Sequence, residues 1–361
     1  PICMEPPTNK DELMRFAKAC VDEDPNGNGE KDTYFMTGAG GGQSFGMLGG
    51  FNTMFGNPAP HVENGQLSHP MFNGVQEKFI AFLNELNNAG VLAPDWYTIE
   101  WEQAKAYTHG DKLGMVWYPA GALLAEYTNA KNKTLESVDV WTYWKEPPIE
   151  GGKYPATGNP GYTWCFTKQG FTDEGKLKRV AHMLDTMVIG GENFFHTIQG
   201  GTNEVFEAMG IKVETPRECV YNDDGTFYIY NEDGFPWRQE DGYSPIGIWQ
   251  HFGLSVIWQR NAPKGATEFD KKHNETANRL NDIILSYDRW PNDSLKINVA
   301  INEIAPNLSD FEKAQELAFV TGKRPMSEWS KYQQEWLDKG GREVIKAIAD
   351  NLNVLVPDYA N

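Results

Sequence analysis

The strongest chemical signal in the sequence is a short polar loop near its beginning, running from Asp24 to Asp32 as Asp-Pro-Asn-Gly-Asn-Gly-Glu-Lys-Asp. Oxygen-bearing side chains recur at alternate positions, with the spacing of positions 1, 3, 5 and 9 of a calcium-binding loop; these are Asp24, Asn26, Asn28 and Asp32. Gly29 falls where such loops turn sharply, and Glu30 follows at the position that offers a backbone carbonyl. Calcium takes about six to eight oxygen ligands, so this pattern predicts a calcium site.

The loop departs from a standard EF-hand at its end. An EF-hand closes with a bidentate glutamate, and Phe35 stands at that position here. A sensor role is therefore not expected, and the predicted calcium would be structural, pinning the loop that follows the first helix. The competing interpretation is a plain polar turn, because Asn, Asp and Gly favour turns without any metal.

Helices are expected on both sides of this loop. The first would begin at Thr8 as its cap, with an apolar stripe ending at Cys20. Hydrophobic periodicity predicts further helices over 74–88, 101–107, 173–189 and 343–352, and others starting at Ser309 (a capping box with Glu312) and Ser327. It also predicts a buried strand over 113–118, a strand over 162–166 and a hairpin over 219–230. Four tryptophans in predicted helical segments are expected to lie in the core, namely Trp249, Trp258, Trp329 and Trp336.

Length and composition limit the classes of function. A chain of 361 residues with 40% hydrophobic residues suits two domains. A formal net charge of −18 disfavours nucleic acid and anionic membranes as partners. The four cysteines fit no zinc motif and are expected to be buried thiols. The chain opens at Pro1 without an initiator Met or signal peptide, so we expect a processed or truncated start.

The segment from Pro7-Thr8 to Phe35 resembles the large extracellular solute-binding proteins of family 1, the LipO-like and alginate-binding lipoproteins of ABC importers. In these, a helix opening with Pro-Thr leads into an Asp-Pro-Asn-Gly-Asn-Gly-x-x-Asp-Glu calcium loop. This chain has Thr33 in place of the last Glu, so Thr33 or water would replace that ligand. Gly90 to Trp96, Gly110 to Met115 and the closing tryptophan-rich helices resemble further family segments in the same order.

This resemblance implies an α/β, helix-rich fold of the periplasmic-binding-protein-like type II, with two lobes and a ligand cleft between them. Residues 1–118 would form the lobe with the calcium loop, 119–195 the return into the second lobe, and 196–361 segments shared between lobes that end in C-terminal helices. The N-terminal part of the family's chain would be lacking. The implied protein is an extracellular monomeric lipoprotein that delivers a carbohydrate to an ABC transporter permease and catalyses nothing.

The resemblance also implies an oligosaccharide ligand, whose sugar rings stack on aromatic side chains. The chain holds 12 Trp, 15 Tyr and 19 Phe, and several of them follow the predicted strand ends and turns. We expect the ligand to contact Trp117, Tyr118, Tyr162, Trp164 and Trp237. A peptide is the alternative ligand, because it would also use aromatic residues.

Two other classes of function compete with solute binding. A carbohydrate-active enzyme would need two carboxylates across a cleft, and no recognisable catalytic motif holds such a pair. The sequence also has no H-E-x-x-H zinc motif and no G-x-S-x-G nucleophile elbow. A calcium-dependent adhesion module would carry paired loops of this kind, whereas one occurs here.

Overall fold

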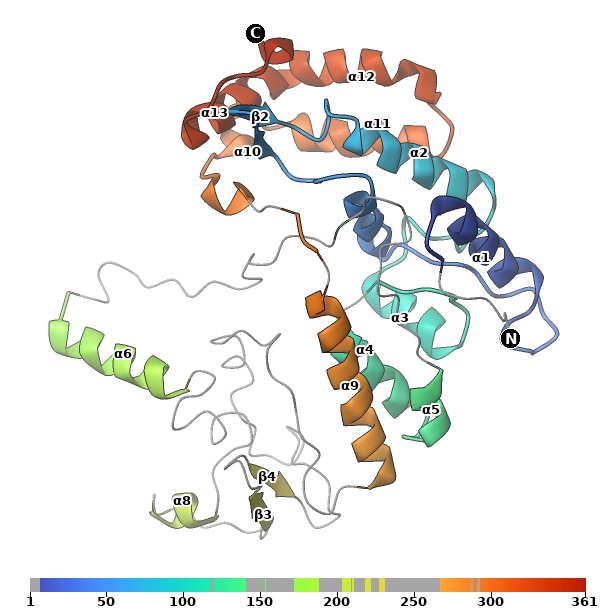
Figure 1. Ribbon diagram of the computed structural model, residues 1–361, viewed down its shortest axis with the longest axis vertical. Coiled ribbons are helices and arrows are strands. Elements are labelled where there is room, and N and C mark those ends of the chain that lie inside the picture. Colours follow the sequence, from blue (N-terminus) through green and yellow to red (C-terminus); the bar gives the residue numbers. More distant parts are fainter. Residues whose placement is uncertain are drawn as a thin grey trace. The chain divides into compact units, whose positions relative to one another are not determined.

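The computed structural model describes residues 7–117, 120–140, 153, 172–187, 203–208, 210, 218–221, 227–230, 267–286, 288–290 and 293–361 (Figure 1). The chain divides into two compact units, one formed by 1–133, 139–159 and 286–361, the other by 134–138 and 160–285. The lobe boundaries expected from the sequence stay predictions. No helix within the described ranges has the length and apolar character needed to cross a bilayer.

The first unit is built from helices at both ends of the chain. Its N-terminal elements are α1 (Lys10–Asp22), the 3₁₀ helix η1 (Gly46–Met54), β1 (His61–Glu63), β2 (Gln66–Ser68), α2 (Val75–Asn88), α3 (Trp101–His109) and α4 (Ala120–Ala130). Its C-terminal elements are η6 (Asp293–Lys296), α10 (Ile301–Ile304), α11 (Leu308–Val320), η7 (Met326–Glu328), α12 (Trp329–Trp336), the π-helical η8 (Leu337–Gly341), α13 (Arg342–Leu352) and η9 (Asp358–Ala360). The predicted helices over 74–88, 101–107 and 343–352 are thereby confirmed.

Two predicted helix caps are wrong. The cap of α1 is Asn9, whose side chain accepts from the Glu12 amide at 3.0 Å, and Thr8 instead donates to the Glu12 carboxylate. Asparagine caps at least as well as threonine, and this register lets Glu12 reach back over the helix start. The predicted capping box at Ser309 does not form, because α11 begins one residue earlier, at Leu308, which is buried in the core.

Short parallel pairings position the segment that follows the polar loop. Tyr34 bridges to Leu113, and Met36 bridges to Leu92. The Phe35 amide donates to the Val91 carbonyl at 2.8 Å. The expected strand over 113–118 is therefore wrong where it is described. The segment forms one bridge and two backbone hydrogen bonds to 34–35, and Gly114 within it disfavours a longer strand.

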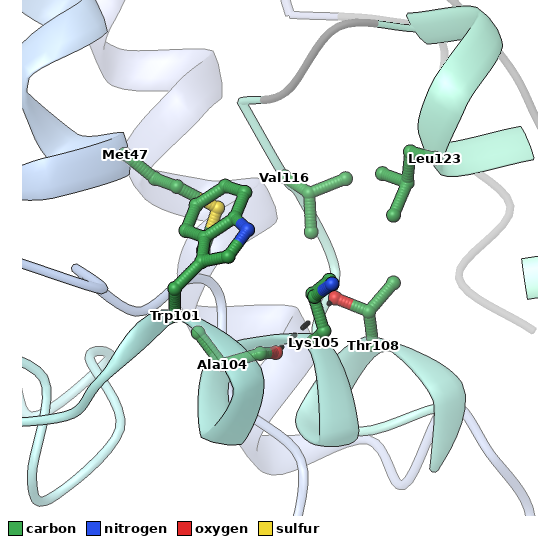
Figure 2. A pocket seen from close by; sticks show the side chains of 7 residues that line it. All are labelled: Met47, Trp101, Ala104, Lys105, Thr108, Val116 and Leu123. Atoms are coloured by element: carbon green, nitrogen blue, oxygen red, sulfur yellow. Dashed lines mark hydrogen bonds between the residues drawn. The ribbon is translucent and has the colours of Figure 1, made fainter. Parts of the chain in front are cut away.

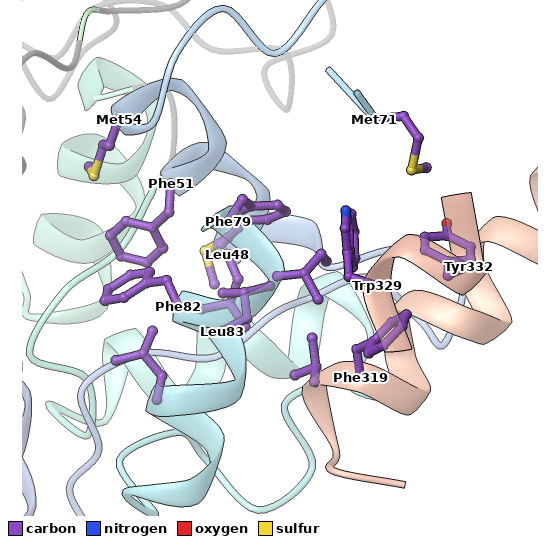
Figure 3. Close-up of a cluster of buried hydrophobic side chains, with 14 of the residues drawn as sticks. Leu48, Phe51, Met54, Met71, Phe79, Phe82, Leu83, Phe319, Trp329 and Tyr332 are labelled. Atoms are coloured by element: carbon purple, nitrogen blue, oxygen red, sulfur yellow. The ribbon is translucent and has the colours of Figure 1, made fainter. Parts of the chain in front are cut away.

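The core of the first unit joins the N-terminal and C-terminal helices (Figure 3). Phe82 on α2 meets Phe51 of η1 edge to face, with ring centroids 5.4 Å apart. Phe319 on α11 packs against Trp329 on α12 at 5.2 Å. The predicted burial of Trp329 and Trp336 is confirmed, since each is 2% exposed. Trp249 and Trp258 lie outside the described residues.

Where α11 faces α2 and α12, one glutamate is buried and a second is half-buried. Glu316 is 6% exposed and accepts a hydrogen bond from Gln76 Nε2 on α2 at 2.7 Å. Glu312, one turn earlier, accepts from Trp336 Nε1 on α12 at 3.3 Å. Burial and the neighbouring Glu312 carboxylate raise the pKa of Glu316 to about 8, because ionised carboxylates are costly in a low-dielectric core.

The second unit is described in part. Its elements are α5 (Leu135–Asp139), α6 (Glu174–Met187), α8 (Asn203–Ala208), β3 (Glu218–Tyr221), β4 (Phe227–Tyr230) and α9 (Glu268–Ser286). The antiparallel pairing of β3 with β4 confirms the predicted hairpin, and α6 confirms the predicted helix over 173–189. The strand expected over 162–166 lies outside the described residues.

Candidate functional site

The polar loop follows α1, and three of its residues adopt the left-handed backbone conformation. Asp24 has φ 45°, Gly27 has φ 69° and Gly29 has φ 80°. Glycine adopts this conformation without steric cost, whereas a side chain at Gly27 or Gly29 would be strained. The loop thus coils back on itself, which brings its alternating oxygen-bearing side chains toward one another.

The first half of the loop is organised by side-chain oxygens that accept backbone N–H groups. Asp24 Oδ2 accepts from Gly29 N at 2.8 Å, and Asp24 Oδ1 accepts from Asn28 N at 3.2 Å. Asn28 Oδ1 accepts from Glu30 N at 2.7 Å. These contacts are typical of Asx turns, so the local chain conformation is fixed by the same residues that were predicted to bind calcium.

Asp32 is the point on which the loop converges. Its Oδ1 accepts from the side-chain amides of Asn26 and Asn28, each at 3.2 Å, and its Oδ2 lies 2.8 Å from Lys112 Nζ. The Lys112 ammonium and the two amides lower the pKa of the Asp32 carboxyl. The structure therefore brings Asp24, Asn26, Asn28 and Asp32 into one network, and adds a lysine that sequence reasoning did not place there.

The donor set of this loop fits a hard divalent cation. It supplies the carboxylates of Asp24 and Asp32 together with the side-chain amides of Asn26 and Asn28. Each amide oxygen accepts one backbone N–H in the loop, from Asn28 to Asn26 Oδ1 at 3.3 Å and from Glu30 to Asn28 Oδ1 at 2.7 Å, and its second lone pair can face a cation beside Asp32. Across the described part of the chain, no three His, Cys, Asp or Glu residues gather as metal ligands, so this loop depends on its amide oxygens.

Thr33 closes the loop against α1. Its buried hydroxyl donates to the Cys20 carbonyl near the end of α1 at 2.6 Å. Cys20 is a free, buried thiol, and burial raises its pKa to about 12, which keeps it unreactive at neutral pH. Thr33 thus fixes the loop to the helix, and its role as a calcium ligand stays a prediction.

Trp117 is the one predicted ligand-binding aromatic that the structure describes. It is half-buried and packs against the core. Its indole lies so close to Gly50 that a Cβ built there would come within 2.2 Å of the ring. The indole can therefore occupy this position only because residue 50 is a glycine, without a side chain. The other predicted ligand-binding residues lie outside the described residues, namely Tyr118, Tyr162, Trp164 and Trp237.

A small hollow beside α3 is too small to hold a sugar. Met47, Trp101 and Val116 line it, together with Leu123 and residues of α3 (Figure 2). Its volume is about 10 Å³, and a single water molecule needs about that much. The half-buried Trp101 side chain therefore packs against the core here and does not line a sugar-sized pocket.

Comparison with known proteins identifies the fold. Neither a protein-family model nor a curated protein sequence matches the chain. Several solved structures do align with nearly all of it. An HMO-binding ABC-transporter-associated solute-binding protein from Bifidobacterium longum infantis has a TM-score of 0.59 at 15% identity, covering 98% of this chain and 71% of its own.

Two further solved structures align with this chain over a similar range. The alginate-binding protein AlgQ2, solved without calcium ion, has a TM-score of 0.58 at 14% identity over 97% of this chain and 69% of its own. FusA of S. pneumoniae, an ABC-transporter substrate-binding protein in complex with kestose, has a TM-score of 0.56 at 16% identity. The alignment covers 97% of this chain and 69% of the FusA chain. The chain therefore has the helix-rich, periplasmic-binding-protein-like fold of the solute-binding proteins of ABC transporters.

Proposed function

We propose that the protein is an extracytoplasmic solute-binding protein that captures an oligosaccharide and delivers it to an ABC transporter permease. The observation that carries this proposal is the fold, shared over 97–98% of the chain with binding proteins for HMO, alginate and kestose. These three ligands differ in sugar and charge but are all carbohydrates. An oligosaccharide is therefore the ligand class that the neighbours have in common.

Capture of this kind needs no bond to be broken. A two-lobed binding protein has open and closed states of similar free energy, and a ligand that contacts both lobes stabilises the closed state by its differential affinity. We expect aromatic faces to stack on the sugar rings, with Trp117 and Tyr118 as contacts in one part of the chain. Tyr162, Trp164 and Trp237 are the further proposed contacts.

The polar loop is proposed to bind calcium as a structural ion. Asp24, Asn26, Asn28 and Asp32 would supply side-chain oxygens, Glu30 a backbone carbonyl, and Thr33 or water the remaining position. The bound ion would neutralise the loop's carboxylates and hold the loop on α1. The neighbours are consistent with this: AlgQ2 was solved without calcium ion, and FusA also as an EF-hand mutant with fructo-nystose.

The partner and location follow from the same class of protein. A solute-binding protein of an importer meets its permease outside the cytoplasm, so we propose an extracellular or periplasmic location. Tethering as a lipoprotein and a monomeric state are proposed with it. A pull-down of the permease from detergent-solubilised membranes, with and without sugar, would test the partner, and no sugar-dependent capture would contradict it.

The ligand proposal is tested by thermal unfolding of the full chain against glycans that include kestose, alginate oligosaccharides and milk-type oligosaccharides. A ligand at 100 times its dissociation constant should stabilise the protein by about 2.7 kcal/mol. Trp117→Ala should weaken binding about tenfold by isothermal titration calorimetry, since loss of ring stacking together with its burial costs about 1.4 kcal/mol. Trp101→Ala is the matched control and should bind normally, because its hollow is too small for a sugar.

The outcomes separate the alternative functions. If no glycan stabilises the protein but a peptide pool does, the ligand is a peptide. If a chromogenic glycoside is hydrolysed, the protein is an enzyme. If calcium-dependent capture of cell-wall proteins occurs without sugar binding, it is an adhesion module.

The calcium proposal is tested with EDTA and two charge-matched variants. Asp24→Asn removes a ligand charge, whereas Glu23→Gln removes an exposed charge next to it. Calcium should raise the melting temperature of the wild type and of Glu23→Gln by similar amounts. It should raise the melting temperature of Asp24→Asn by less. Equal melting temperatures with calcium and with EDTA in all three proteins would leave the loop as a plain polar turn.

A further inference from the structure

Lys112 places a positive charge at the point where the candidate calcium loop would receive its cation. Its Nζ lies 2.8 Å from Asp32 Oδ2, while the amides of Asn26 and Asn28 both donate to Asp32 Oδ1. Three donors from separate side chains therefore surround this carboxylate. A carboxylate has about four acceptor positions, so a cation that binds Asp32 directly either takes the one that is left, close to the ammonium, or replaces one of these donors.

The position of Lys112 is fixed by backbone pairing. The Lys112 carbonyl accepts from Tyr34 N at 2.9 Å, and Gly114 N donates to the Tyr34 carbonyl at 2.9 Å. Tyr34 follows Asp32 by two residues, so this pairing carries the lysine to the end of the loop. The Lys112 amide is held as well, by the Tyr107 carbonyl at 2.9 Å. The ammonium is thus delivered by fixed neighbouring backbone, although its side chain remains 41% exposed.

We propose that Lys112 is a tethered cation that competes with calcium for Asp32 and so sets the calcium affinity of the loop. This inference rests on the calcium binding proposed above. Without calcium, the ammonium neutralises Asp32 and keeps the loop folded. With calcium, the same ammonium must move away from Asp32 or remain beside a divalent ion that repels it. Both effects make the stability of the protein less dependent on calcium.

The test compares three variants with the wild type. Lys112→Met keeps most of the side-chain stem and removes the charge, and Lys112→Arg keeps the charge. Lys31→Met is the matched control, because Lys31 is an exposed loop residue for which no ion pair occurs among the described residues. Calcium affinity is measured by titration calorimetry on metal-stripped protein, and melting temperature is measured with calcium and with EDTA. Circular dichroism in calcium checks that each variant is folded.

Removal of the ammonium should tighten calcium binding about tenfold, because a unit charge about 6 Å from a divalent ion raises the free energy of binding by about 1.4 kcal/mol even in water. Lys31→Met should change the affinity by less than about threefold, because salt screens an exposed charge without direct contact. The calcium affinity of Lys112→Arg should stay close to that of the wild type, because arginine keeps the positive charge. The loss of melting temperature in EDTA should be largest for Lys112→Met.

Each outcome decides the proposal. Calcium binding by Lys112→Met alone, or tighter binding by Lys112→Met than by the wild type and Lys31→Met, supports it. Equal or weaker calcium binding by Lys112→Met, while the wild type binds, overturns the role of Lys112 and leaves the calcium site standing. No binding by either protein overturns the calcium site and, with it, this inference.

Discussion

Glu316 makes the stability of the first unit depend on pH in a direction opposite to that of most acids. Burial together with the Glu312 carboxylate raises its pKa from an ordinary 4.5 to about 8. The unfolded chain releases this proton near pH 4.5, whereas the native protein keeps it until about pH 8. Between these values the native state binds more protons, so stability falls as the pH rises.

The size of the effect follows from that pKa difference. Each pH unit within this window lowers the free energy of unfolding by about 1.4 kcal/mol. Three units, from pH 5 to pH 8, therefore amount to about 4 kcal/mol for this group. A change of 1 kcal/mol moves the melting temperature of a domain this large by about 2–4 °C, so the loss is on the order of 10 °C.

The variant that isolates this effect is Glu316→Gln. Glutamine has the shape of the protonated acid and can still accept from Gln76, and it leaves the Glu312 contact with Trp336 in place. Melting temperatures of wild type and variant should be close at pH 5, and the variant should melt about 10 °C higher at pH 8. Glu77→Gln, an exposed change on α2, should follow the wild type at every pH.

Thermal unfolding followed by circular dichroism between pH 5 and 8, at constant ionic strength, is the assay. Parallel curves for wild type and Glu316→Gln would refute the reasoning, because they would mean that Glu316 ionises in the native state as it does in the unfolded chain. A lower melting temperature of the variant at pH 8 would refute it as well.

Two further changes test the packing around the candidate site by urea unfolding. Gly50→Ala should destabilise the protein by about 1–3 kcal/mol, because its methyl group would overlap the Trp117 indole. Gly49→Ala should change stability by less than about 0.5 kcal/mol, since nothing lies within 4 Å of its added methyl group; equal effects of both would contradict the contact. Thr33→Val should cost about 1–3 kcal/mol, because the buried Cys20 carbonyl loses its donor, and an unchanged midpoint would count against that role.

Local sequence patterns predicted the helices whose signals lie within a few residues. The apolar stripe of α2 and the amphipathic pattern of α13 are complete in the sequence, and the turn residues at 222–225 indicated the β3–β4 hairpin. The alternating oxygens from Asp24 to Asp32 likewise belong to one short segment. Such features depend on neighbours along the chain, so the sequence is sufficient to locate them.

Contacts between distant segments were decided by the tertiary structure. Lys112 reaches Asp32 because residues 34 and 113 pair as parallel neighbours, and no pattern near either residue indicates this. The sequence predicted a capping role for Glu312 and gave no sign of a buried acid at Glu316, yet packing of α11 on α2 and α12 buries Glu316 and partly buries Glu312.

The sequence by itself thus determined the polar loop, the main helices and the class of fold, through local spacing and a family resemblance. The tertiary structure decided which charges are paired, which acids have a raised pKa and where Trp117 lies. The physical reason is that pairing, desolvation and close packing depend on atoms brought together from far along the chain, whereas capping, turns and hydrophobic periodicity depend on the nearest residues.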